Sequence, residues 1–165
     1  MPLMGTVMYE EQLAQINAVL SRLRADSNAR AVFLIDRNGQ QLAQTGGLVD
    51  EFDATSLASL TAGNVASTDA IARLIGEREF TALVHEGDKD SLHISLVSPR
   101  IILVVLFDER SSLGLVRLRV RKAATDLVEV FEAIDRRQAD ETARGDTHAS
   151  PFSEITDDDI DSLFA

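Results

Sequence analysis

The chain of 165 residues contains no cysteine, no tryptophan and a single tyrosine. The absence of cysteine excludes disulfide bonds, thiolate metal sites and a cysteine nucleophile. No apolar run reaches the ~20 residues that a membrane-spanning helix needs. Residues 1–11 also lack the basic and apolar regions of a secretion signal. We therefore expect a cytoplasmic protein that does not insert into a membrane.

Positive charge is scarce, with 16 Lys and Arg against 27 Asp and Glu and a net charge of −11. Such a balance argues against nucleic-acid binding as the function, because phosphates are repelled. The excess is uneven, since residues 138–165 contain eight acids and only one basic residue, Arg144. We therefore expect a folded body at 1–137, a polar, disordered linker at 138–150 and a separate acidic peptide at 151–165.

Catalytic signatures are missing as well. The sequence has no phosphate-binding glycine loop, no dinucleotide-binding glycine motif and no nucleophile elbow. Among three histidines, His85 and His93 could share one face of a sheet, but no third metal ligand stands at suitable spacing. The sequence therefore predicts neither an enzyme nor a bound metal or cofactor.

Apolar periodicity predicts three helices and five strands. Leu13, Ile16, Leu20 and Leu23 recur at helical spacing, and a longer run of this kind extends from Leu113 to Ile134. The pair Asn38-Gly39 predicts a hairpin turn, because both residue types tolerate positive φ angles. The predicted helices are 8–25, 53–77 and 112–137, and the predicted strands are 32–35, 41–45, 80–85, 92–97 and 101–107.

The resulting element order is α-β-β-α-β-β-β-α. Strands joined by hairpins and one helical crossover predict a five-stranded, mainly antiparallel sheet with helices on both faces. We therefore expect an α/β (α+β) fold of three layers, α-β-α. The edge strands of such a sheet need a cover or a partner.

The middle predicted helix carries two different stripes. The stripe expected to face the core is Leu57, Leu60, Asn64, Thr68, Ile71 and Ile75. A line of small residues lies away from it: Ser59, Gly63, Ala66 and Ala70, with Ala58 and Ala62 beside it. Glycine inside a helix costs ~1 kcal/mol relative to alanine. The line is either a surface that another backbone can approach closely or an incidental run of good helix formers.

The C-terminal peptide 151–165 is the second unusual segment. Large apolar residues return there among the acids: Phe152, Ile155, Ile160, Leu163 and Phe164. The last three share one helical face at i, i+3 and i+4. A helix of about two turns is too short to be stable alone. We expect the peptide to fold onto a groove of a partner, with docking on its own body as the alternative.

A cluster of positive charge, Arg117, Arg119, Arg121 and Lys122, stands out in this acidic chain. It is either a solvated helix face that pairs with acids such as Asp126 or a dock for an acidic surface. That acidic surface could belong to a partner or to the chain's own tail. The sequence leaves these possibilities open.

Several stretches resemble the roadblock/dynein light chain family: SLASLTAGNVA (56–66), LIGE (74–77), HEG (85–87), VVLFD (104–108) and SLGLVRLRV (112–120). The resemblance extends to SPFSEITDDDIDSLF (150–164). This last stretch is similar to bacterial members that regulate a small Ras-like GTPase in cell polarity and gliding motility. The resemblance implies a roadblock-type sandwich for residues 1–137 and a place in the cytoplasm, concentrated at a cell pole.

A homodimer is also implied by the resemblance. In the family, the middle helices of two subunits lie side by side, and the strands that follow them pair across the dimer. Carried onto this chain, the implied dimer interface is Ala58, Gly63, Ala66, Phe80, Ala82 and Val84.

Such a dimer is expected to bind a small Ras-like GTPase and to accelerate GTP hydrolysis without an arginine finger, by favouring the reactive conformation. The implied GTPase contacts are Ser59, Ala62, Gly63, Ala66 and Ala70 in the helix, and Phe152, Ile155, Ile160, Leu163 and Phe164 in the peptide. The alternatives are a non-catalytic scaffold or adaptor subunit and a small-ligand sensor. The scarcity of aromatic residues disfavours the sensor.

Overall fold

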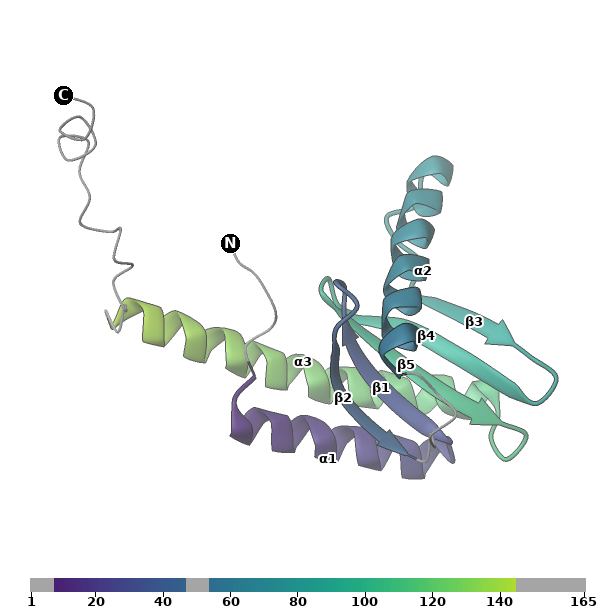
Figure 1. Ribbon diagram of the computed structural model, residues 1–165, viewed down its shortest axis with the longest axis horizontal. Helices are drawn as coiled ribbons and strands as arrows, with labels where there is room; N and C mark the ends of the chain where they lie inside the picture. The colour runs from purple at the N-terminus through teal and green to yellow at the C-terminus, as the bar shows by residue number, and fades with distance from the viewer. Residues whose placement is uncertain (1–7, 47–53, 145–165) are drawn as a thin grey trace.

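The structure, a computed structural model, describes residues 8–46 and 54–144. The expected element order is confirmed (Figure 1). Its elements are α1 (Glu10–Ser27), β1 (Ala31–Asp36), β2 (Gln41–Gly46), α2 (Ala54–Ile75), β3 (Ala82–Glu86), β4 (Asp90–Ser98), β5 (Ile101–Asp108) and α3 (Leu113–Ala143). No helix in these two ranges is both long enough and apolar enough to cross a bilayer.

The five strands form one sheet in the order β2-β1-β5-β4-β3, and every neighbouring pair is antiparallel. Helices α1 and α3 cover one face, and α2 lies on the other (Figure 1). This is the three-layer fold that the sequence predicts. β2 and β3 are the two edges, so β3 offers unpaired backbone groups along its outer side.

The two faces of β1 build two separate cores. Val32 and Leu34 point toward α1 and α3, whereas Ala31, Phe33 and Ile35 point toward α2. A central strand that is buried on both sides reads as a continuous apolar run, as β1 and β5 do. β1 pairs with β5 at the centre of the sheet, and both strands contribute side chains to each of the two cores.

The expected core face of α2 is wrong. Leu60, Ile71 and Ile75 are 74%, 51% and 63% exposed, and the other members of that stripe, Leu57, Asn64 and Thr68, are half-buried. The residues that face the sheet are smaller: Ala58, Thr61, Ala62, Val65 and Ala72. Small side chains let the helix backbone approach the sheet closely, so the bulkier residues are left on the outside.

The last helix is longer than predicted. α3 continues to Ala143, so residues 138–143 are helical, although a linker was expected from residue 138. Tyr9 stabilises this extension, because its hydroxyl donates a 2.8 Å hydrogen bond to Glu141 and its ring packs against the guanidinium of Arg137. Arg137 also forms an i,i+4 ion pair with Glu141. The remainder of the expected linker and the peptide 151–165 lie outside the described residues.

Candidate functional site

The turn between β1 and β2 positions α2. Asp36 is buried, and its Oδ1 accepts hydrogen bonds from the backbone N–H groups of Asn38 and Gln40. Gly39 completes the turn with φ +87°, whereas Asn38 keeps a negative φ. A Cβ at Gly39 would lie 3.1 Å from the Cα of Ser59. Because glycine has no side chain and adopts this positive φ without strain, the turn can lie directly against the N-terminal half of α2.

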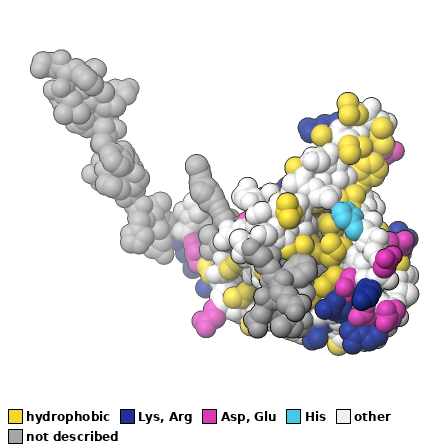
Figure 2. Space-filling model, turned by 45° about the vertical axis from the view of Figure 1, so that its right-hand side comes forward, with side chains coloured by type: hydrophobic (Ala, Val, Ile, Leu, Met, Phe, Trp, Pro, Cys, Tyr) yellow, Lys and Arg dark blue, Asp and Glu magenta, His cyan; other side chains and the backbone are white. Residues whose placement is uncertain are grey.

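The C-terminal half of α2 extends beyond the edge of the sheet (Figure 1). Figure 2 shows hydrophobic side chains gathered over this projecting end. The exposed large apolar residues of the helix are Leu60, Ile71, Leu74 and Ile75, and Leu74 is 86% exposed. We call these four residues the outer apolar stripe. Exposed apolar residues that gather along one helix indicate a surface for another macromolecule.

The small residues lie beside this stripe. Ser59, Gly63, Ala66 and Ala70 are all exposed. A Cβ built on Gly63 meets no atom within 4 Å, so packing inside the subunit does not require glycine at this position. The glycine lowers helix propensity, and no neighbour among the described residues of its own subunit requires it. This favours a role for the small line in an intermolecular contact.

Two predicted site residues do not belong to that surface. Ala58 is 1% exposed and Ala62 is 9% exposed, and both pack on the sheet in the core shared with Phe33 and Ile35. Neither side chain is available to a second subunit or to a GTPase. They lie on the flank next to the small line, where periodicity alone could not separate the inner from the outer residues.

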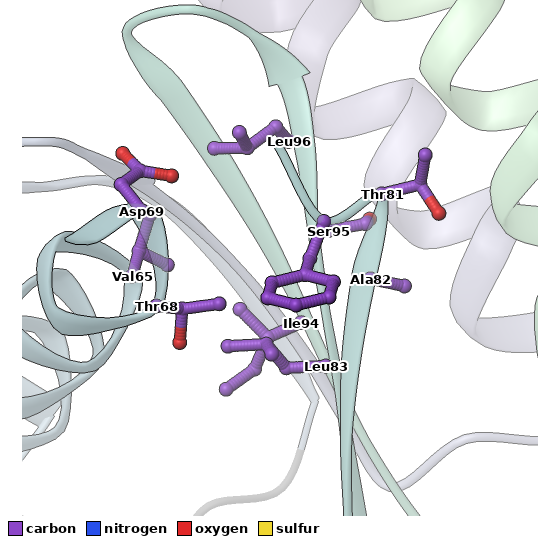
Figure 3. A pocket seen from close by; sticks show the side chains of 10 residues that line it. Val65, Thr68, Asp69, Thr81, Ala82, Leu83, Ile94, Ser95 and Leu96 are labelled. Atoms are coloured by element: carbon purple, nitrogen blue, oxygen red, sulfur yellow. The ribbon is translucent and has the colours of Figure 1, made fainter. Parts of the chain in front are cut away.

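The two flanks of α2 face different neighbours. Ser59 lies on the flank toward the β1–β2 turn. Thr68 lies on the opposite flank and lines a notch between α2 and β3, together with Val65, Leu83 and Ile94 (Figure 3). By helical spacing, Leu60 and Ile71 belong on the side of Thr68. Leu60 and Ile71 therefore lean toward the free edge of the sheet, whereas the small line leans away from it.

The predicted residues of β3 flank the free edge. Phe80 is half-buried and lines the notch, and Ala82 and Val84 are half-buried on the strand itself. In register, Ala82 stands opposite Ser95 and Val84 opposite His93. The outer apolar stripe, the notch and the β3 edge thus belong to two consecutive elements, α2 and β3.

His85 and His93 do not come together as a metal site. His85 pairs with Leu92 and His93 pairs with Val84, so the two rings point to opposite faces of the sheet. The expectation that they could share a face is wrong. His93 is 3% exposed, and its pKa is lowered, first because burial disfavours the charged ring and second because Arg117 is nearby. Within 8–46 and 54–144, no group of three potential ligands could hold a metal ion.

The chain is similar to known proteins over most of its length. The sequence model of the family described as Roadblock/LC7 domain matches residues 15–107. No curated protein matches the chain.

Solved structures extend the similarity. Myxococcus xanthus MglB is 55% identical, with a TM-score of 0.73, over 78% of this chain and 96% of its own. The gliding protein MglB of Thermus thermophilus is 33% identical, with a TM-score of 0.74, over 80% and 99% of the two chains. A structure described as MglB with tetrameric arrangement is 32% identical, with a TM-score of 0.75, over 81% and 99%.

Proposed function

Since the chain belongs to the roadblock/LC7 family, we propose that it is a homodimeric GTPase-activating protein for a small Ras-like GTPase of the MglA type. The proposal rests chiefly on the outer face of α2, which exposes large apolar residues beside a line of small ones. The protein itself carries out no catalytic step in this proposal, and it acts in the cytoplasm at a cell pole.

The dimer contact belongs on the flank of α2 that faces β3. A second copy that pairs along β3 would extend the sheet through the edge residues Ala82 and Val84. The same approach would bring the α2 helices together through Leu60 and Ile71, which are exposed in the single subunit. Each copy would contribute the same residues, because a twofold interface is self-complementary.

This geometry divides the implied contacts between two partners. Gly63 and Ala66, which the resemblance assigns to both surfaces, point away from the β3 side and suit the GTPase contact better. Ser59 and Ala70 extend the same line in both directions. Small side chains along an exposed helix let a switch region of the GTPase lie close to the backbone. Phe80 remains with the dimer contact.

The C-terminal peptide supplies the second GTPase contact in this proposal. Its residues, Phe152, Ile155, Ile160, Leu163 and Phe164, lie outside the described part of the chain. A twofold dimer has one α2 platform and two such peptides. We therefore propose a complex of two subunits with one GTPase, in which one peptide binds a site away from the platform.

Activation requires that the dimer bind the reactive conformation of the GTPase more tightly than the resting one. Arg73 is the arginine that continues the small line, three residues after Ala70. If it were an arginine finger, its removal would cost ~10³–10⁵-fold in hydrolysis. We expect Arg73→Ala to retain most of the stimulation, because the proposed mechanism orders the catalytic residues of the GTPase itself.

Single-turnover hydrolysis tests the proposal. A small Ras-like GTPase of the MglA type from the same organism is loaded with GTP, and hydrolysis is followed for the GTPase alone, with the wild-type chain and with Arg73→Ala. We expect a dose-dependent acceleration that saturates near two subunits per GTPase. Binding without acceleration would instead support the scaffold function. A collapse of the stimulation with Arg73→Ala would refute the proposed mechanism.

A further inference from the structure

The N-terminal third of α3 carries a cationic surface that the proposed function does not use. Arg117, Arg119, Arg121 and Lys122 all fall within the first ten residues of the helix. Three of them are exposed and Arg119 is half-buried. Leu118 lies among them and is 58% exposed. We call these five residues the α3 patch.

The cations of the patch lack ion-pair partners in the part of the chain that the structure describes. Asp26 and Asp126 line the same groove between α1 and α3 as Arg119 and Lys122, yet neither pairs with them. The Nε of Arg119 is buried and has no hydrogen-bond partner among the described residues. The interpretation of the cluster as a helix face paired internally with Asp126 is therefore not supported.

The patch is unfavourable for α3 itself. Arg117 and Arg121 are one helical turn apart, where like charges repel. Repulsive arrangements that have no internal compensation are expected at functional sites. An anionic ligand would remove this repulsion.

The chain carries a segment of matching chemistry. Residues 151–165 contain five acids and no basic residue: Glu154, Asp157, Asp158, Asp159 and Asp161. Large apolar residues alternate with these acids. A peptide of this kind could place carboxylates on the arginines and an apolar side chain on Leu118.

The tether is long enough for this contact. Lys122 lies 21 residues before the end of α3 at Ala143, a distance of about 32 Å along the helix. Twelve residues lie between Arg144 and Asp157, and the thirteen steps along the chain can span up to about 44 Å when extended. A connection of this length also keeps the segment at a high effective concentration near the patch.

We propose that the acidic segment 151–165 docks in cis on the α3 patch when no GTPase is bound. The contact holds the segment against the opposite side of the molecule from α2. It is electrostatic and weakens as the ionic strength rises. The inference concerns the free protein, so it does not depend on the proposed GTPase activation.

Zero-length carbodiimide crosslinking of the full-length protein tests the contact. The chain has only two lysines, Lys122 in the patch and Lys89 in the β3–β4 turn, so Lys89 serves as an internal control. Peptide mass spectrometry should find Lys122 joined to acids of 151–165, and Lys89 joined to them rarely. Mixed ¹⁴N and ¹⁵N protein distinguishes the segment of the same chain from that of a second copy.

Charge reversal supplies the matched variant. Arg117→Glu combined with Arg121→Glu keeps Lys122 and should lower its crosslink yield about tenfold, as expected when two weak ion pairs become repulsive. Arg136→Glu reverses an exposed cation at the far end of α3 and should leave the yield unchanged. If the charge-reversal variant fails to fold by circular dichroism, Arg117→Gln with Arg121→Gln replaces it.

Three results would overturn the proposal. Equal or absent crosslinks at Lys122 and Lys89 would show that the segment does not select the patch. Crosslinks only between differently labelled chains would assign the contact to a second copy. A yield that charge reversal leaves unchanged would show that the cations do not hold the segment.

Discussion

Arg37 in the β1–β2 turn donates a hydrogen bond from Nη1 to Oδ2 of Asp69 on α2, and so ties the turn to the helix across 32 residues of sequence. Both side chains are about one-third exposed. α2 contacts the sheet through small side chains, so this ion pair is a main polar restraint on the orientation of the platform helix.

Breaking this pair should destabilise the protein modestly. We expect Arg37→Ala and Asp69→Asn to share a coupling free energy of ~0.5–1 kcal/mol in a double-mutant cycle, since a partly exposed ion pair is screened by solvent. Urea denaturation of the wild type, both single variants and the double variant measures this energy. Additive effects of the two substitutions would mean that the pair does not hold α2.

The separation of Arg37 and Asp69 along the sequence explains why this ion pair was not predicted. Arg37 and Asp69 belong to different elements, and local periodicity carries no information about such a pair. The same reason applies to α3, whose extension through residues 138–143 depends on Tyr9 at the other end of the folded body. The element order, in contrast, follows from local apolar spacing and turn residues, and it was predicted correctly.

The prediction of the buried face of α2 was wrong for a different reason. The helix is apolar on two sides, so periodicity identifies two stripes without showing which one is buried. Ala58 and Ala62 pack on the sheet in the core, and their small side chains let the helix lie close to the strands. α2 has more large apolar residues than one face of a helix can bury. This number alone could have indicated that some of them are exposed.

A long charged side chain on the small line should block GTPase binding. We expect Ala66→Arg to lower the affinity for the GTP-loaded GTPase more than ~100-fold, because the close approach of the two backbones is lost. Ala139→Arg makes the same change at an exposed position of α3 and should bind normally. Pull-down and circular dichroism of both variants test this. Wild-type affinity of a folded Ala66→Arg variant would exclude the small line from the interface.

Gly63 should show opposite effects on stability and on binding. Because a methyl group there meets no atom of its own subunit, Gly63→Ala should stabilise the fold by ~0.5–1 kcal/mol through higher helix propensity. The same methyl group should weaken the GTPase complex. Thermal unfolding and titration of the GTPase separate the two effects. Tighter binding by this variant would contradict the proposed close contact.

The outer stripe should control oligomeric state. We expect Leu60→Glu with Ile71→Glu to convert the dimer into a folded monomer, because each buried apolar side chain contributes ~1.5–3 kcal/mol and each occurs twice in a symmetric interface. Leu118→Glu changes a similarly exposed leucine on α3 and should leave the dimer intact. Sedimentation equilibrium measures the masses. A dimer that persists with both glutamates would place the interface elsewhere.

His93 should make the fold sensitive to mild acid. Its pKa in the folded protein lies below the ordinary value of 6.5, because the ring is buried and Arg117 adds positive charge. The unfolded chain therefore binds a proton more readily than the folded one below about pH 6.5. The resulting contribution to stability is complete above that pH and declines as the pH falls toward the folded pKa. Urea denaturation between pH 7.5 and 5.5 should show this decline in the wild type.

Replacing His93 tests whether this histidine causes the loss of stability in mild acid. His93→Gln removes the titrating group and should flatten the dependence of the unfolding free energy on pH in this window, even if the variant is less stable overall. The comparison depends on slopes rather than on absolute stability, so a general packing defect at position 93 cannot imitate it. An unchanged slope in His93→Gln would show that burial of this histidine does not govern the acid sensitivity.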